Sequence, residues 1–274
     1  MRIAIFRKTI APENEVYMQK LIQELTDNHV EVVDCFTSHG ELDGRVDMLL
    51  SIGGDGTMLD AVPLVGNSGI PMLGINMGRL GFISSVAKEE IHEAIKQIVE
   101  GRFATESRTL LELVAPQGVF HDKVNYALNE INIIRNPEHS LLTIKVFVND
   151  VFLNTYWGDG ILMATPTGST AYSLSAGGPI LTPDSHCFVI TPIAAHNLTV
   201  RPIVIPDDSV VRIQVEGREK KFVFSMDSRV CALDTSVELV VRKADFCINT
   251  VRMEGTDFFS TIRNKLSWGK DNRN

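Results

Sequence analysis

The chain has 274 residues, of which 44% are hydrophobic and 22% are charged, and its formal net charge is −8. This length suits one large or two moderate domains, whose core needs no disulfide or metal to hold it. The acidic balance argues against a nucleic-acid-binding protein, which would show a basic stripe, and no apolar run approaches the ~18–20 residues of a membrane span.

The cysteines and the first residues bear on the compartment of the protein. Cys35, Cys187, Cys231 and Cys247 are far apart and form no C-x-x-C pair. This spacing is typical of reduced thiols rather than of a disulfide framework or a zinc site. Residues 1–6 read as a short strand and not as the apolar core of a signal peptide. We therefore expect a cytoplasmic protein.

Strands and helices alternate over the first hundred residues. Short apolar runs predict strands at residues 3–6, 30–36, 48–52 and 72–75. Apolar side chains at helical spacing predict one helix around residues 18–25 and a second around residues 91–99, which ends before Gly101. This alternation is typical of a parallel, doubly wound sheet, so we expect an α/β domain over residues 1–105.

The strand at residues 48–52 runs directly into the turn Gly53-Gly54-Asp55-Gly56-Thr57. Glycines let the backbone turn sharply and approach a ligand closely, and we expect a positive φ at Gly54. The helix that follows points its positive amino end at a ligand at the carboxyl end of the strand. The turn predicts a site for a phosphorylated ligand, with Asp55 placed to handle one proton. The alternative is a plain strand-to-helix turn in which Asp55 caps the helix.

From about residue 109 the pattern changes to short β-rich runs. We expect a mostly antiparallel β domain over residues 106–254, with Asn149-Asp150 as a two-residue hairpin turn. Helical spacing at residues 257–266 predicts a last helix, within residues 255–274, that packs back on the first domain and completes it. The predicted strands of the β-rich part are residues 110–114, 127–134, 143–148, 151–155, 161–164, 210–215, 222–225, 237–241 and 246–250.

Two polar segments interrupt the β-rich half. Asn129 and Glu130 are adjacent, so within a strand they point to opposite faces. An amide can pair with an adenine edge and a carboxylate can accept ribose hydroxyls, although a solvated strand edge is the alternative. Residues 165–179 are rich in small hydroxyls and glycines, which form anion-binding concavities. A flexible Ser/Gly loop is the alternative there, and the embedded Tyr172 argues against it.

Three common signatures are absent from the sequence: the P-loop, the G-x-G-x-x-G fingerprint and the spacing of a zinc hydrolase. The segments that are present, in their order, resemble the NAD kinase family, which transfers a phosphoryl group from a nucleoside triphosphate to the adenosine ribose 2′-hydroxyl of NAD and makes NADP. The resemblance covers most of the chain. It includes the turn at residues 53–57, the stretch 76–82, Asn129-Glu130, Asp159-Gly160 and the segments 165–179, 196–202 and 263–269.

The resemblance implies an N-terminal Rossmann-like α/β domain followed by a β-sandwich-like domain, with Asp55 as the general base. It implies ATP and NAD as substrates, a divalent metal (Mg²⁺, or else Mn²⁺) with no protein ligands assigned, and a homo-oligomer, either dimer or tetramer. The residues that it places against the bound nucleotides are Gly54, Asp55, Gly56, Phe82, Asn129, Glu130, Asp159, Thr167, Thr170, Ala171, Tyr172, Ser173, Leu174, Ser175, Ala194 and Arg229.

Two positions depart from the pattern of the family. Trp157 stands where many relatives carry Arg, and Arg229 stands where Gln is often found. Both departures bear on local contacts to the NAD phosphates or ribose and not on the reaction. Two other functions stay open on the residues alone: a lipid kinase that shares the turn at residues 53–57, and a non-catalytic sensor that binds a dinucleotide.

Overall fold

A computed structural model describes residues 1–8, 12–36, 42, 45–78, 81–120, 124–136, 140–217 and 220–269. The chain divides into two compact units. Unit 1 comprises residues 1–107 and 248–274, and unit 2 comprises residues 108–247. Each is described by itself below, and the predicted domain boundaries at 105/106 and 254/255 stay a prediction. No helix among the described residues is long and apolar enough to cross a membrane.

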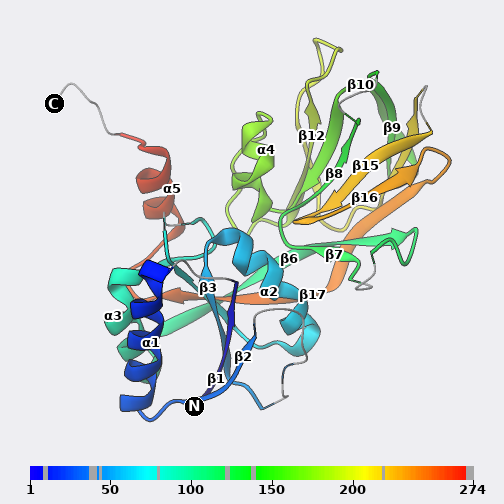
Figure 1. Ribbon diagram of the computed structural model, residues 1–274. Coiled ribbons are helices and arrows are strands. Elements are labelled where there is room, and N and C mark those ends of the chain that lie inside the picture. The colour runs from blue at the N-terminus through cyan, green and yellow to red at the C-terminus, as the bar shows by residue number, and fades with distance from the viewer. Residues whose placement is uncertain are drawn as a thin grey trace. The chain divides into compact units, whose positions relative to one another are not determined.

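Unit 1 is a parallel sheet with helices on both faces, as the alternating pattern predicts (Figure 1). The strands lie in the order β17-β4-β3-β1-β2, and all of these pairs are parallel. The elements are β1 (Arg2–Arg7), α1 (Glu15–Asp27), β2 (Glu31–Phe36), β3 (Met48–Gly53), α2 (Asp55–Val65), β4 (Met72–Asn76), β5 (Val86–Ala87), α3 (Ile91–Val99), the start of β6 (Phe103–Ala115), which continues into unit 2, the end of β17 (Leu239–Met253) and α5 (Phe258–Leu266), with short 3₁₀ turns at Pro12–Asn14, Gly66–Ser68 and Lys88–Glu90.

The core of unit 1 follows from the amphipathic pattern of its helices. Met18 and Leu21 of α1 and Ile95 of α3 pack together with Ile5 and Leu50 of the sheet. α2 covers the opposite face and contacts β1, β3 and β4. α3 ends as the sequence predicts, because Gly101 lies in the left-handed region with φ 69°.

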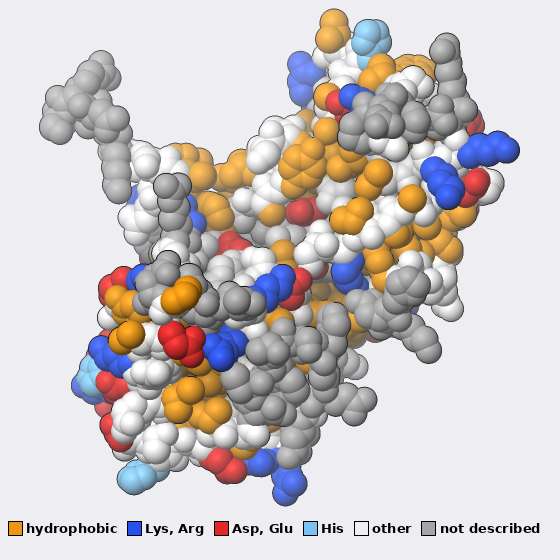
Figure 2. All heavy atoms as spheres, viewed as in Figure 1, with side chains coloured by type: hydrophobic (Ala, Val, Ile, Leu, Met, Phe, Trp, Pro, Cys, Tyr) orange, Lys and Arg blue, Asp and Glu red, His pale blue; other side chains and the backbone are white. Residues whose placement is uncertain are grey.

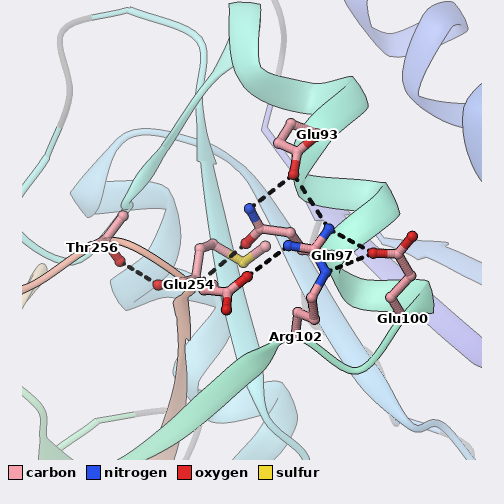
Figure 3. A network of polar contacts seen from close by, with 7 residues as sticks. Glu93, Gln97, Glu100, Arg102, Glu254 and Thr256 are labelled. Atoms are coloured by element: carbon pink, nitrogen blue, oxygen red, sulfur yellow. Dashed lines mark hydrogen bonds and ion pairs between the residues drawn. The ribbon is translucent and has the colours of Figure 1, made fainter.

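A polar network fastens the returning strand β17 to α3 (Figure 3). The Arg102 guanidinium donates to Glu100 Oε2 at 2.6 Å and to Glu254 Oε2 at 2.7 Å. Gln97 accepts the N–H of Glu254 at 3.1 Å and donates to Glu93 Oε1 at 3.1 Å. Because these groups are exposed, we expect their hydrogen bonds to orient the end of β17 relative to α3 and to add little to the free energy of unfolding.

The last helix, α5, belongs to unit 1, which confirms that it packs back on the first part of the chain. Asp257 caps it, because its Oδ1 accepts the N–H of Ser260 at 2.9 Å. Ile262 is buried, and the Lys265 ammonium lies 5.3 Å from the centre of the Phe82 ring.

Unit 2 is an antiparallel sandwich. One sheet has the order β13-β12-β11-β8-β15-β16, and β10, β9, β14 and the first part of β17 form the other. Inward side chains of both sheets share one core, which includes Ile133, Ile144, Ile161, Val211 and Phe224. The further elements are β7 (Tyr126–Ala127), β8 (Glu130–Ile134), β9 (Leu142–Val148), β10 (Val151–Gly158), β11 (Gly160–Ala164), α4 (Tyr172–Ser175), β12 (Cys187–Ile193), β13 (Ile203–Pro206), β14 (Val211–Glu216), β15 (Lys221–Met226) and β16 (Arg229–Asp234), with a 3₁₀ turn at Gly168–Thr170.

Several predictions about single elements are confirmed and others are wrong. Asn149 and Asp150 form the tight β9–β10 turn, with φ 50° and 62°. The two strands predicted at 237–241 and 246–250 are one continuous strand, β17, which pairs with β14 in its first part and with β4 near its end. The strand predicted at 127–134 is interrupted at Leu128-Asn129, and β12, β13 and β16 were not predicted.

Candidate active site

The Asp55 carboxylate lies in unit 1 against the backbone of residues 82–84. Its Oδ2 accepts the N–H of Phe82 at 2.7 Å, and its Oδ1 accepts the N–H of Ser84 at 2.9 Å, the hydroxyl of Ser84 at 2.7 Å and the N–H of Ile83 at 3.2 Å. Gly54, not Asp55, occupies the N-cap position of α2, and no side chain caps that end. The alternative of a plain helix cap is therefore wrong, because Asp55 binds a different segment.

The glycines around Asp55 serve different purposes. A Cβ on Gly81 would lie 1.7 Å from Asp55 Oδ1, and a Cβ on Gly53 would lie 2.2 Å from Thr57 Oγ1. Gly54 and Gly56 have no atom within 4 Å of such a Cβ, so the turn is open at these two positions. The expected positive φ at Gly54 is wrong, because its φ is −106° and any residue can adopt this value.

The stretch after β4 brings Ser84 to Asp55. Asn76 Oδ1 accepts the N–H of Gly78 at 2.8 Å, and Asn76 Nδ2 donates to Ser84 Oγ at 3.0 Å. Gly74 permits this approach, because a Cβ there would lie 2.6 Å from Ser84 Cα. Residues 79–80 of the predicted segment lie outside the described residues. Ser84 was not among the predicted site residues, although it lies only two residues after the stretch 76–82.

In unit 2, the Asn129-Glu130 pair is buried at the start of β8. Asn129 is 5% exposed and Glu130 is 8% exposed, so the alternative of a solvated strand edge is wrong. Asn129 Oδ1, Glu130 Oε2 and Asn132 Oδ1 are buried and have no hydrogen-bond partner. Asn132 lies two residues after Glu130 and therefore on the same face of β8. An amide within an otherwise apolar strand was the sequence feature that could have identified it as a site residue. Buried polar atoms without a partner are rare, and they favour a ligand at this place.

The surroundings of Glu130 favour its protonated form. Burial raises the pKa of Glu130, the charge of Asp227 raises it further, and a hydrogen bond from the backbone of Tyr172 lowers it, with the result at about 8. The sequence analysis treats Glu130 as a carboxylate that accepts hydroxyls. The neutral acid can also donate, so it can bind a ligand acceptor as well as a ligand hydroxyl.

The segment 165–179 uses most of its hydroxyls to hold its own shape. Thr165 Oγ1 donates to the Leu128 carbonyl at 2.5 Å, and Thr165 N–H donates to the Asn129 carbonyl at 2.9 Å. Ser169 Oγ donates to the Pro166 carbonyl at 2.6 Å. A Cβ on Gly168 would lie 2.1 Å from the Asn129 carbonyl oxygen. The flexible-loop alternative is wrong, because the segment is folded tightly against Asn129.

The predicted contacts in this segment differ in their exposure. Ser173 is completely buried, and its hydroxyl lies 3.2 Å from Thr191 Oγ1. Thr170 Oγ1 donates to the Thr167 carbonyl at 3.1 Å. The remaining predicted residues keep part of their surface open: Ala171 and Leu174 are partly buried, and Tyr172 and Ser175 are exposed. Thr167 is buried.

Asp159 and Ala194 lie near each other in unit 2. Asp159 N–H donates to the Ile193 carbonyl at 3.1 Å, and its Oδ1 lies 2.6 Å from Arg135 Nε. Ala194 has a positive φ of 44°. The Trp157 side chain is exposed, and its carbonyl accepts the N–H of His196 at 2.6 Å.

Arg229 binds backbone carbonyls. Its guanidinium donates to the carbonyl of Val124 at 2.7 Å and to that of Tyr126, and it lies 5.3 Å from the centre of the Phe120 ring. A direct contact of Arg229 with a ligand stays a prediction.

The predicted residues therefore form groups within each unit. Asp55 lies with Phe82 and the turn glycines in unit 1, whereas Asn129 and Glu130 lie with the segment 165–179 in unit 2. Sequence reasoning missed Ser84, Asn132 and Asp227. Among the described residues, no cluster of three or more His, Cys, Asp or Glu side chains could hold a metal ion.

Gly81→Ala should displace the Asp55 carboxylate, because the added methyl would occupy the position of Oδ1. Because Asp55 is the predicted general base, we expect kcat of the predicted phosphoryl transfer to fall at least about tenfold, since a small misplacement of such a group is costly. Gly78→Ala is the matched control, because its Cβ would lie 3.8 Å from Asn76 Oδ1, an ordinary contact. Steady-state kinetics of both variants test this, and equal effects would contradict it.

Glu130→Gln should change how stability depends on pH. The unfolded chain releases the Glu130 proton near pH 4.5, whereas the folded chain keeps it up to about pH 8. Between these two values only the folded chain binds this proton, so the free energy of unfolding falls as pH rises. Gln does not titrate. The free energy of unfolding of the variant, relative to that of the wild type, should therefore rise by about 1.4 kcal/mol for each pH unit within the window. Urea unfolding at several pH values measures it, and a constant difference would contradict it.

Comparisons with known proteins match both halves of the sequence. A family model of the ATP-NAD kinase N-terminal domain matches residues 37–103, and one of the ATP-NAD kinase C-terminal domain matches residues 128–253. An NAD kinase of Flavobacterium psychrophilum is 42% identical over an alignment of 294 positions, which covers 100% of both chains. An NAD kinase of Bacteroides fragilis is 39% identical over an alignment of 290 positions, with the same coverage.

Solved structures agree with these matches. A yeast NADH kinase in complex with NADH superposes with a TM-score of 0.85 at 26% identity, and the match covers 99% of this chain and 89% of that one. An NAD kinase from Archaeoglobus fulgidus in complex with ATP superposes with a TM-score of 0.82 at 26% identity, and the match covers 97% and 99%. With curated relatives at about 40% identity over its full length, the chain belongs to the NAD kinase family.

Proposed function

We propose that Asp55 is the general base with which this enzyme phosphorylates NAD. The activity is that of its family, ATP-dependent phosphorylation of NAD. In the reaction that we propose, the adenosine ribose 2′-hydroxyl attacks the γ-phosphorus of ATP. The new P–O bond makes NADP, the bond to the β-phosphate oxygen breaks, and ADP leaves. The hydroxyl proton passes to the Asp55 carboxylate and from there to water.

The position of Asp55 carries this proposal. Its carboxylate is held by Phe82, Ile83 and Ser84, directly beside the open positions Gly54 and Gly56. Both carboxylate oxygens already accept hydrogen bonds, so the substrate hydroxyl has to share or replace one of them. Phosphoryl transfer needs an aligned nucleophile and little covalent catalysis. A firmly held carboxylate can align the substrate hydroxyl by accepting its hydrogen bond.

The dinucleotide contacts that we propose lie in unit 2. Asn129 and Glu130 offer buried polar atoms without partners, and these are the strongest signs of a missing ligand. We propose that Asp159, Ala194 and the exposed parts of residues 167–175 complete the contacts. Neutral Glu130 can donate to an acceptor of the ligand and accept from a ribose hydroxyl.

A divalent metal, Mg²⁺ or else Mn²⁺, would enter with the triphosphate as part of the substrate. Among the described residues, no group of three or more His, Cys, Asp or Glu side chains could hold a resident ion. We propose that substrate phosphates and water supply the ligands of the metal. The metal would neutralise phosphate charge during transfer.

We also propose a homo-oligomer, dimer or tetramer, in the cytoplasm. On the face drawn in Figure 2, hydrophobic side chains reach the surface over strands of unit 2. Val151 is 70% exposed and Phe152 is 54% exposed on β10, an edge strand that a second copy could cover. Cys187, Cys231 and Cys247 are free, as suits a reducing compartment.

The two alternative functions gain nothing from these observations. A lipid kinase needs an apolar substrate site, whereas the buried groups at Asn129 and Glu130 are polar. A non-catalytic sensor would not need Asp55, and the curated relatives reported above are named as kinases.

The test is a coupled assay in which purified protein receives NAD, ATP and Mg²⁺, and NADP is detected by an NADP-specific dehydrogenase. Asp55→Asn keeps the shape of the side chain but loses the base, so NAD binding should survive and kcat should fall at least about a hundredfold. Calorimetry measures the binding. Near-normal turnover of the variant would show that Asp55 is not the base, and wild-type protein that makes no NADP would refute the activity.

Removal of divalent metal with EDTA should abolish NADP formation, because the triphosphate charge is then unshielded. NAD binding measured by calorimetry should change little, since the proposed metal travels with ATP. Addition of Mg²⁺ should restore turnover. A large loss of NAD affinity in EDTA would point to a resident metal instead.

A further inference from the structure

The hairpin between β15 and β16 ends in the two residues Asp227 and Ser228. Met226 pairs with Arg229 across this turn, and Asp227 has a positive φ of 51°. The Asp227 carboxylate accepts the N–H groups of Leu128 at 2.8 Å, Asn129 at 2.8 Å and Glu130 at 3.2 Å. The N–H of Asp227 in turn donates to the Glu130 carbonyl at 3.0 Å.

Arg229, at the other side of the same turn, binds the chain just before this point. Its guanidinium donates to the carbonyls of Val124 and Tyr126. The carboxylate thus faces N–H groups, and the guanidinium faces carbonyls. We call Asp227 and Arg229 together the hairpin clasp.

The clasp explains why the predicted strand 127–134 is interrupted. The N–H groups of Leu128 and Asn129 are bound by Asp227, and regular strand structure resumes only at Glu130. In an uninterrupted strand, Asn129 and Glu130 would have to point to opposite faces. The interruption frees Asn129 from this alternation.

Holding Asn129 and Glu130 in place has a cost in the absence of a ligand. Both bury a polar atom without a partner, which is unfavourable because each atom has lost its hydrogen bonds to water. Hydrogen bonds to a charged acceptor are stronger than neutral ones, so three of them on one carboxylate can offset this cost.

We propose that Asp227 is a positioning residue for the dinucleotide, which holds the Leu128–Glu130 backbone so that the Asn129 and Glu130 side chains face bound NAD. The proposal rests on the proposed function and adds a residue that does not itself contact substrate.

The charge of Asp227 also acts on Glu130. Besides burial, Asp227 raises the pKa of the Glu130 carboxyl, and the backbone of Tyr172 lowers it. Burial raises the pKa of Asp227 itself, whereas the three backbone N–H groups that it accepts and the charge of Arg229 lower it and favour the ionised form. Loss of the Asp227 charge removes a cause that raises the pKa of Glu130, so Glu130 would ionise at lower pH. If neutral Glu130 donates to NAD, the pH above which NAD binding weakens moves down with it.

The experiment compares Asp227→Asn with wild type and with Asp207→Asn. Asp207 is the matched control, because it is also a buried acid of unit 2. Its carboxylate accepts from Lys243 Nζ at 2.8 Å and lies 3.6 Å from His186 Nδ1, and neither of these contacts involves Asn129 or Glu130. We expect Asp227→Asn to raise the KM for NAD at least about tenfold, because misplaced binding groups lose contacts. The KM for ATP should stay within about twofold, as expected for a change confined to the NAD contacts.

The pH profile separates positioning from simple loss of stability. In Asp227→Asn, the alkaline fall in NAD affinity should begin at lower pH than in wild type, and in Asp207→Asn it should not move. An unchanged KM for NAD in Asp227→Asn, or an equal rise in Asp207→Asn, would overturn the proposal.

A second variant covers the case in which Asp227→Asn does not fold, as judged by circular dichroism. Asp227→Glu keeps the acid but places its carboxylate one methylene further from the N–H groups of residues 128–130, so a selective rise in the KM for NAD supports the proposal and an unchanged KM overturns it. Wild-type protein is assayed first: if it makes no NADP, the proposed function has failed and not the role of Asp227.

Discussion

A carboxylate that accepts consecutive backbone N–H groups organises each unit of this enzyme. In unit 1, Asp55 accepts the N–H groups of residues 82–84, and in unit 2, Asp227 accepts those of residues 128–130. Backbone N–H groups outside helices and strands need a partner when they are buried. A single carboxylate serves three of them at once, so an irregular segment becomes as well defined as a strand.

The two carboxylates have different tasks. Asp55 stands beside open positions of its turn, as the proposed base requires, whereas the Asp227 carboxylate binds the backbone that it holds. The glycines follow the same division. Gly81 is needed because Asp55 fills the space of its missing side chain, while Gly54 and Gly56 leave space in which a substrate can lie. In both units, then, packing that looks purely structural decides where the proposed functional groups lie: the base in unit 1 and the binding groups in unit 2.

Sequence alone predicts much of this arrangement, because the signals are local. Alternating strands and amphipathic helices indicate the α/β fold, and the turn at residues 53–57 and the segment 165–179 identify the site. The interruption at Leu128 and the continuity of β17 could not be predicted, since a residue far away in the chain causes the first and pairing with successive partners sustains the second. Ser84, Asn132 and Asp227 were missed for the same reason: a lone Ser, Asn or Asp gains its meaning from what folding brings beside it.

The clasp also implies an order in which segments of this protein reach their final structure during synthesis. Asp227 binds the N–H of Leu128 across 99 positions of the chain, whereas Asp55 reaches Phe82 across only 27. A nascent chain that has not yet reached residue 227 lacks the group that interrupts the strand at Leu128, and its segment 127–134 is free to form the regular strand that its sequence favours. The segment that we propose to bind the dinucleotide therefore takes its final form late in synthesis, and the parallel sheet of unit 1 is completed later still, when the end of β17 pairs with β4.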